Sequence, residues 1–184
     1  MKMKTALVLA GLASLVVLNS CKEAAPLTEV APINQLESVL LTELPAGALS
    51  VADAFANPTP GTSITITGKV MGRMEPFIEN RAMVVLGDPS KITPCNHKHD
   101  DGCQTPWDVC CDDPEVIKKS VATIQILGEN GRPLKQGLKG LSGIQELTTL
   151  TVVGEIAEGS NAENLLINAS GIHVGATDPF MAKQ

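Results

Sequence analysis

The sequence predicts an all-β domain, and three observations carry that prediction. Apolar and polar side chains alternate in several short segments, a period typical of half-buried strands. Turn-forming residues separate these segments, as at Asn130-Gly131. Apolar residues make up 43% of the 184, which is enough for a core. We therefore expect one domain of strands joined by loops and short helices.

Five strands are expected along the chain. The first follows Gly61, where Ile64, Ile66 and Val70 point to one side of the strand and the intervening polar residues point to the other. The others are expected at residues 81–86, 121–127, 148–156 and 165–174. Residues 137–147 carry leucine or isoleucine about every third position, which predicts a short helix before the fourth strand.

Three strands, a helical link and two strands are the order of an OB-fold, a small five-stranded barrel. We place this domain at residues 59–176, with a tail at residues 177–184. Such barrels commonly bind oligonucleotides or sugars on the face of their second and third strands. The sequence assigns that face no basic or aromatic side chains, so the fold alone does not license the usual function.

A tether is expected before the barrel, at residues 21–58, because its prolines break any long helix or strand. Two short helices are expected within it. One is predicted at residues 33–40 by apolar side chains at helical spacing. The other begins at Ser50, which is three residues before Asp53, the spacing of a capping box.

The first residues have the pattern of a signal peptide, which we place at residues 1–20. A short cationic start precedes an apolar run over residues 5–18, which is too short to cross a bilayer comfortably. Leu18, Ser20 and Cys21 then resemble a bacterial lipobox, with Cys21 as the lipid acceptor. The sequence therefore predicts an acylated protein anchored to a membrane.

The expected compartment is the cell envelope. By resemblance to other lipoproteins, Lys22 after the acylated cysteine favours the periplasmic face of the outer membrane. Thiols oxidise outside the cytoplasm, so disulfides are expected there.

Composition argues against nucleic acid as a partner. The formal net charge is −6, and aromatic residues make up 2% of the chain. Nucleic-acid binding needs cations for phosphates and flat rings for bases. The sequence also holds no phosphate-binding loop, dinucleotide motif or serine elbow. We expect neither an enzyme nor a nucleic-acid-binding protein.

The most unusual segment is the long loop at residues 88–120, between the second and third strands. Loops of this length are usually functional or internally tied. The loop concentrates chemistry-bearing side chains, namely Cys95, His97, His99, Cys103, Trp107, Cys110 and Cys111. It is also acidic, from Asp88 to Glu115, which would attract cations.

The first interpretation of these cysteines is structural. Four cysteines can form two disulfides in three pairings. Direct closure between the adjacent Cys110 and Cys111 violates the usual Cα separation. Cys95 and Cys103 would then each pair with one of them, in either arrangement. Each bridge would contribute on the order of 3 kcal/mol and order the loop.

The second interpretation is a metal site, although no cofactor is certain. The four loop cysteines with His97 and His99 are a ligand set for Zn²⁺ or a copper ion. Against it, the cysteine spacings do not match the close Cys-x-x-Cys pairs of ordinary zinc sites.

The third interpretation, redox chemistry at Cys110 and Cys111, is the weakest. Reactive cysteines need nearby cations or a helix N-terminus. Their neighbours are instead Asp108, Asp112 and Asp113.

Two other side chains call for simpler interpretations. Trp107 follows a proline and is expected to pack as a lid on the barrel, with ligand contact as its alternative role. His173 lies within the last strand and is expected to be partly buried and not catalytic.

Residues of the loop also resemble a family of uncharacterised exported bacterial proteins with an OB-like barrel. The shared signature is an isolated cysteine followed by Cys-x-Thr-Pro-Trp-Asp-x-Cys-Cys. It is matched by Cys95, Cys103, Thr105, Pro106, Trp107, Asp108, Cys110 and Cys111. The resemblance covers about residues 50–175 and implies no particular activity. His97 and His99 are outside the signature.

Together these observations predict a lipid-anchored, non-catalytic binding module of the cell envelope, with a disulfide-stapled loop as its recognition surface. Its partner would be an envelope protein or a small ligand. The alternative is an envelope protein that binds zinc or copper through the loop.

Overall fold

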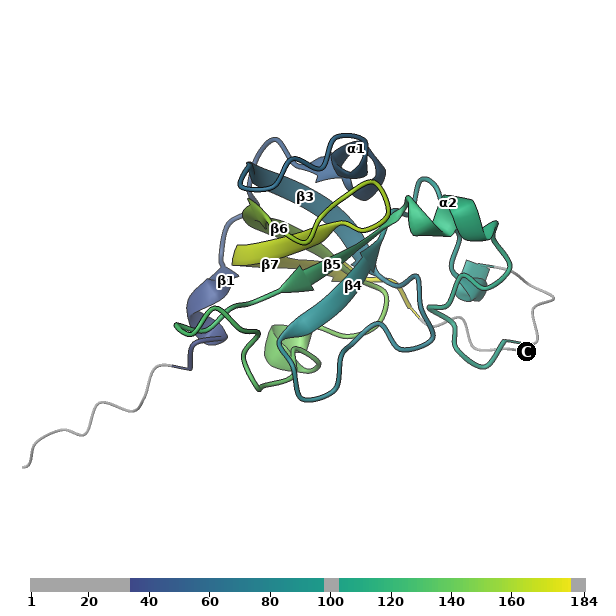
Figure 1. Ribbon diagram of the computed structural model, residues 1–184. Coiled ribbons are helices and arrows are strands. Elements are labelled where there is room, and N and C mark those ends of the chain that lie inside the picture. The colour runs from purple at the N-terminus through teal and green to yellow at the C-terminus, as the bar shows by residue number, and fades with distance from the viewer. Residues whose placement is uncertain (1–33, 98–102, 180–184) are drawn as a thin grey trace, which may run out of the picture. The chain divides into compact units, whose positions relative to one another are not determined.

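The computed structural model describes residues 34–97 and 103–179 (Figure 1). The predicted signal peptide at residues 1–20, the predicted acyl site Cys21, and His99 lie outside the described residues. Among the helices that are described, none is long and apolar enough to cross a membrane.

Short strands make up most of the regular structure in these residues. The strands are β1 (Leu40–Leu41), β2 (Leu49–Ser50), β3 (Ser63–Val70), β4 (Met83–Gly87), β5 (Val121–Gln125), β6 (Thr148–Ile156) and β7 (Leu166–Thr177). The helices are α1 (Val51–Phe55) and α2 (Pro114–Lys118), with 3-10 turns η1 (Glu37–Val39), η2 (Cys95–His97) and η3 (Leu141–Gly143).

Five of the strands close into a barrel, as predicted (Figure 1). β4 pairs antiparallel with β3 and β5, and β5 pairs in parallel with β7. β6 then pairs antiparallel with both β7 and β3, which closes the sheet. The all-β prediction of an OB-fold-like barrel is therefore confirmed.

The core follows the predicted alternation. In β3, Ile66 and Val70 are fully buried, whereas Thr67 and Lys69 are only partly buried. Buried aliphatic residues of the other barrel strands complete the same cluster. The predicted strand at residues 121–127 ends as β5 at Gln125, and Leu127 forms only an isolated bridge with Pro133 before the turn at Asn130-Gly131.

The segment before the barrel packs against it. β1 pairs in parallel with β7, and β2 pairs in parallel with β3. α1 begins where predicted, since the Ser50 hydroxyl accepts a hydrogen bond from the Asp53 amide at 3.1 Å. Val51 and Ala54 of α1 are buried in the barrel core.

Two predicted helices are present only as single 3-10 turns. Residues 137–147 contain only the turn η3, because Gly140, Ser142 and Gly143 take left-handed backbone angles that an α-helix excludes. The apolar residues of this segment still serve the core, and Ile144 is fully buried. The helix predicted at residues 33–40 is a single turn, η1, that leads into β1.

The pairing of β6 with β7 has two irregularities, and a glycine explains one of them. The register of the two strands shifts between Val153 and Gly154. A Cβ atom at Gly154 would lie 2.3 Å from the carbonyl oxygen of Asn168. Only glycine lets the two backbones approach this closely.

Candidate functional site

The long loop begins and ends at one point of the sheet. Gly87 and Val121, at the ends of β4 and β5, are paired across the strands. The Asp88 amide then donates a hydrogen bond to the Ser120 carbonyl at 2.8 Å. Residues 89–119 therefore project from a fixed base.

A small hydrophobic cluster docks the loop on the end of the barrel. Ile92 and Val109 of the loop pack with Met71 after β3 and Leu147 before β6, and all four are buried. Trp107 packs against the same cluster, in agreement with its predicted role as a lid. Its indole Nε1–H donates to the Met74 carbonyl at 2.7 Å, which fixes the ring.

Two backbone hydrogen bonds align the first cysteine with the later ones. The Cys95 amide donates to the Asp108 carbonyl, and the Asn96 amide donates to the Pro106 carbonyl, both at 2.8 Å. They bring Cys95 beside the Cys110-Cys111 pair.

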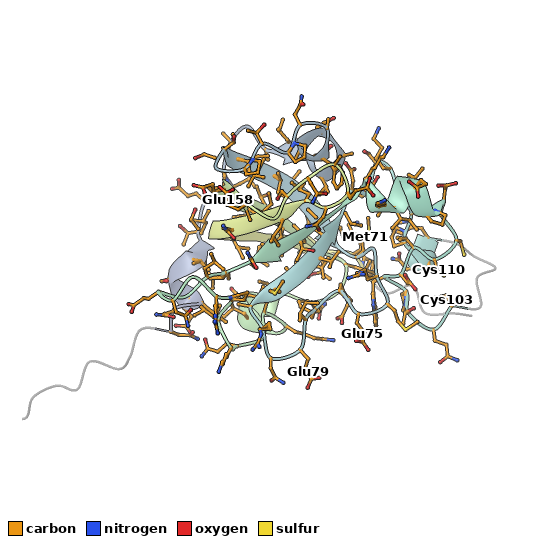
Figure 2. The ribbon with its side chains drawn as sticks, viewed as in Figure 1. Met71, Glu75, Glu79, Cys103, Cys110 and Glu158 are labelled. Atoms are coloured by element: carbon orange, nitrogen blue, oxygen red, sulfur yellow. The ribbon has the colours of Figure 1, made fainter. Side chains whose placement is uncertain are left out.

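The four loop cysteines gather around Cys110, as Figure 2 shows for Cys103 and Cys110. The Sγ atoms of Cys95, Cys110 and Cys111 all lie within 4.8 Å of one another. Cys110 Sγ is also within 4.8 Å of Cys103 Sγ and of an Asp108 carboxylate oxygen. The distance from Cys95 Sγ to Cys110 Sγ is 3.9 Å, longer than a disulfide bond. We call the four residues the cysteine cluster.

The Cys103 thiol contacts the neighbouring Thr105. Its Sγ lies 3.2 Å from the Thr105 hydroxyl oxygen and 3.5 Å from the Thr105 carbonyl oxygen. Hydrogen bonding with the Thr105 side chain, and then with its backbone, lowers the pKa of the Cys103 thiol, although burial acts in the opposite direction. Cys95 is buried, whereas Cys110 and Cys111 are exposed.

Most acidic side chains described in the loop hold its backbone. Asp113 caps α2 through its side chain, and Asp112 accepts a hydrogen bond from the Thr93 amide at 2.6 Å. Asp88 is buried and accepts from the Ala52 amide at 3.0 Å. The expectation that these carboxylates attract cations did not consider their hydrogen bonds to the backbone. Among the described acidic residues of the loop, only Asp108 has a carboxylate oxygen in a group with the cysteine sulfur atoms.

His97 points to a different partner. Its Nε2 lies 3.5 Å from a carboxylate oxygen of Asp178, which also pairs with Lys69. Within the described residues, neither group of sulfur ligands includes His97. Lys69 and then His97 lower the pKa of Asp178, against the effect of burial. His173 is partly buried, as predicted, and its buried Nδ1 has no hydrogen-bond partner among the described residues.

The barrel face beside the loop carries a hollow of about 360 Å³. Val85 of β4 and Thr123 of β5 line it, together with Arg73 and Lys118 from the adjoining segments. β4 and β5 themselves contribute no basic side chain to this hollow, so its two cations come from the segments beside the face. Lys118 forms an ion pair with Glu163, whereas Arg73 forms none among the described residues.

Comparisons with protein-family models, with curated proteins and with solved structures find no match to this chain. The site has to be interpreted from its own residues.

The structure adds positions that sequence reasoning missed. Asp88 and Asp178 act through partners distant in the sequence, and no local pattern marks them. The cysteine cluster was predictable from the sequence, because four cysteines within one loop were expected to lie close together.

Proposed function

We propose that this protein is a lipid-anchored, non-catalytic binding module of the cell envelope. Its recognition surface would be the long loop, stapled internally by two disulfides and docked on the end of the barrel by its hydrophobic cluster. The observation that carries the proposal is the central position of Cys110, whose sulfur lies within 4.8 Å of the other three. A loop with such a tie and its own buried cluster keeps a fixed shape for recognition.

One of the two open pairings fits the cluster better. Cys95 and Cys111 lie within 4.8 Å of each other, as do Cys103 and Cys110. Cys103 and Cys111 do not share such a group in the described part of the loop. The proposed bridges are therefore Cys95–Cys111 and Cys103–Cys110.

Intact mass tests the staple. Protein purified from the periplasmic side without reductant should be lighter by four hydrogens than the reduced protein. Peptide mapping should then recover the two proposed bridges. A non-reduced protein with the full mass of four thiols would overturn the staple.

The proposed anchor rests on the lipobox residues alone. Cys21→Ala should move the protein from the membrane fraction to the soluble fraction, because acyl chains supply the anchor. Cys103→Ala is the matched control and should stay with the membrane. A Cys21→Ala variant that remains in the membrane fraction contradicts the lipoprotein proposal.

Non-catalytic binding is favoured because the described part of the loop holds no hydrogen-bonded set of a nucleophile, a general base and a group that orients the base. His97, the one described histidine of the loop, lies against Asp178 and not against a cysteine.

The second candidate function is binding of zinc or a copper ion by the cysteine cluster. In a tetrahedral zinc site, Zn–S distances of about 2.3 Å place neighbouring sulfur atoms about 3.8 Å apart. The 3.9 Å between the sulfur atoms of Cys95 and Cys110 matches that spacing. Cys111 would be a third ligand, with Cys103 or Asp108 near enough to Cys110 to approach the site.

Metal analysis separates the two candidates. If the cluster binds metal, the protein as isolated should contain about one zinc or copper per chain and four thiols. Cys110→Ser should release it, whereas His97→Ala tests whether the histidine contributes at all. Metal-free protein with two disulfides excludes this candidate.

A further inference from the structure

A basic surface lies at the end of the β4–β5 pair that is remote from the long loop. At one end of this pair, Gly87 lies opposite Val121, where the loop begins and ends. At the other end, Met83 lies opposite Gln125. The chain then continues into a hairpin at residues 126–134. The loop and the hairpin therefore lie at opposite ends of the same two strands.

The hairpin and the segment before β4 hold each other in place. The Ala82 amide donates to the Leu134 carbonyl, and the Ile126 amide donates to the Ala82 carbonyl, both at 2.9 Å. Ala82 and Ile126 are buried in the barrel core, and Leu134 packs against it. The backbone that carries the neighbouring surface residues is therefore fixed on the barrel.

Three cations surround a hollow of about 570 Å³ on this surface. They are the exposed residues Arg81, Arg132 and Lys135, which we call the basic patch. Glu129 is the one acidic residue in the described lining, whereas Glu79 lines a different hollow together with Arg73. No ion pair joins the basic patch to a described residue, and even full neutralisation by Glu129 would leave two positive charges in excess.

The basic patch is also close along the chain to the proposed acyl site. Gln35 lines the same hollow, and the next residue, Leu36, is buried in the barrel core. Gln35 follows Cys21 by fourteen residues, which span at most about 50 Å when fully extended. An acylated Cys21 would therefore keep the patch near the bilayer surface and raise its effective concentration there.

We propose that the basic patch docks on anionic phospholipids, with its three cations against the headgroup phosphates. The formal net charge of −6 opposes this contact. Salt screens charges that lie more than about 8 Å away at physiological ionic strength, so the charges next to the headgroups decide the outcome. The proposal rests on the proposed lipid anchor and names the membrane component that the domain itself binds.

Docking has a consequence for the long loop. Because the loop lies at the opposite end of β4 and β5, it would point away from the bilayer while the patch is bound. The proposed recognition surface would then be open to a partner in the envelope.

Vesicle flotation tests the docking without an acyl chain. The protein is the full-length Cys21→Ala variant, and the vesicles contain phosphatidylcholine alone or mixed with phosphatidylglycerol. At low ionic strength, the bound fraction should be larger on the anionic vesicles and should fall as salt is added. Equal binding to the two kinds of vesicle would overturn the proposal.

The test variant adds Arg81→Gln, Arg132→Gln and Lys135→Gln to the same background. It should bind the anionic vesicles about tenfold more weakly or less, because each basic side chain near a charged surface adds to the attraction. Equal melting temperatures would show that the variant folds. Unchanged binding by this folded variant would exclude the patch.

The matched control removes three cations from the long loop, through Lys91→Gln, Lys118→Gln and Lys119→Gln. It has the same net charge as the test variant and the same residues 1–20, and it should bind as the parent does. An equal loss in the control would assign binding to overall charge and would overturn the proposal.

Inorganic phosphate distinguishes a lipid headgroup from a soluble anion. At matched ionic strength, phosphate should leave the protein on the anionic vesicles. Complete release would assign the patch to a free phosphate ligand and would overturn docking on lipid. Membrane fractionation of the wild type and Cys21→Ala decides the acyl anchor separately, so failure of the patch and failure of the anchor are distinguishable.

Discussion

At Asp88, one carboxylate joins two distant parts of the chain. One oxygen accepts the Ala52 amide of α1, and the other accepts the Ser90 amide at 2.9 Å and the Ser90 hydroxyl at 2.7 Å. Burial alone would raise the pKa of this carboxyl. The hydrogen bonds from Ser90 and Ala52 outweigh burial, and the pKa is lowered.

We predict that Asp88→Asn lowers the free energy of unfolding by about 1–3 kcal/mol at pH 7, because buried donors lose a charged acceptor. Urea unfolding measures the difference. The folded pKa is below the unfolded value, so the ionised group stabilises the fold above about pH 4. This contribution is lost as the pH falls through the folded pKa.

The control for this prediction is Asp53→Asn, an exposed change in α1, the helix that Asp88 contacts, and it should cost less than about 0.5 kcal/mol. The difference in free energy of unfolding between the wild type and Asp88→Asn should become smaller as the pH falls. A difference that stays unchanged down to pH 2 would contradict the stabilising role of the ionised Asp88 carboxylate.

Residue-scale roles were the hardest to predict from the sequence. Asp88 acts on an amide 36 residues earlier, and His97 meets a carboxylate near the end of β7. Local spacing cannot encode such pairs. The gathering of the cysteines was easier to predict, because all four lie within one loop, which limits how far apart they can be.

At the scale of elements, the barrel strands were predictable where one face of a strand is buried. Buried and more exposed residues alternate along much of β3 and β6, because successive side chains point into and out of the barrel. The link before β6 was misjudged because apolar spacing predicts burial, whereas Gly140 and Gly143 decide the backbone. β1 and β2 are two residues long, too short to leave a pattern.

The register of β6 and β7 depends on Gly154. We predict that Gly154→Ala lowers the free energy of unfolding by about 1–3 kcal/mol, because its Cβ would meet the Asn168 carbonyl. Thermal and urea unfolding measure this change. Gly159→Ala is the matched control, since its Cβ would make only an ordinary contact of 3.7 Å. Equal losses in the two variants would argue against a special role for Gly154.

At the scale of the whole described domain, the apolar core has two parts. One cluster fills the barrel, and a smaller one holds the loop through Met71, Ile92, Val109 and Leu147. The loop can therefore lose order while the barrel strands keep theirs.

This division predicts the effect of Cys103→Ser. The change should leave one unpaired thiol and a protease-sensitive loop, whereas β3, β6 and β7 keep slow amide exchange. Exchange measured by mass spectrometry, with limited proteolysis, tests it. Gln104→Ala, an exposed neighbour, is the control and should leave the loop protected. Fast exchange throughout the barrel in Cys103→Ser would refute the independence of the loop.

The two-residue strand β1 has a mechanical consequence if Cys21 carries the anchor. Any pull on the molecule from the bilayer would reach the domain first at Leu36, which is buried in the barrel core, and then at the short parallel contact of β1 with β7. The ring of strands is closed by β3 to β7 alone. Detaching this N-terminal segment under load would therefore lengthen the tether and leave β3 to β7 paired. The domain could then reach farther from its membrane without unfolding of the barrel.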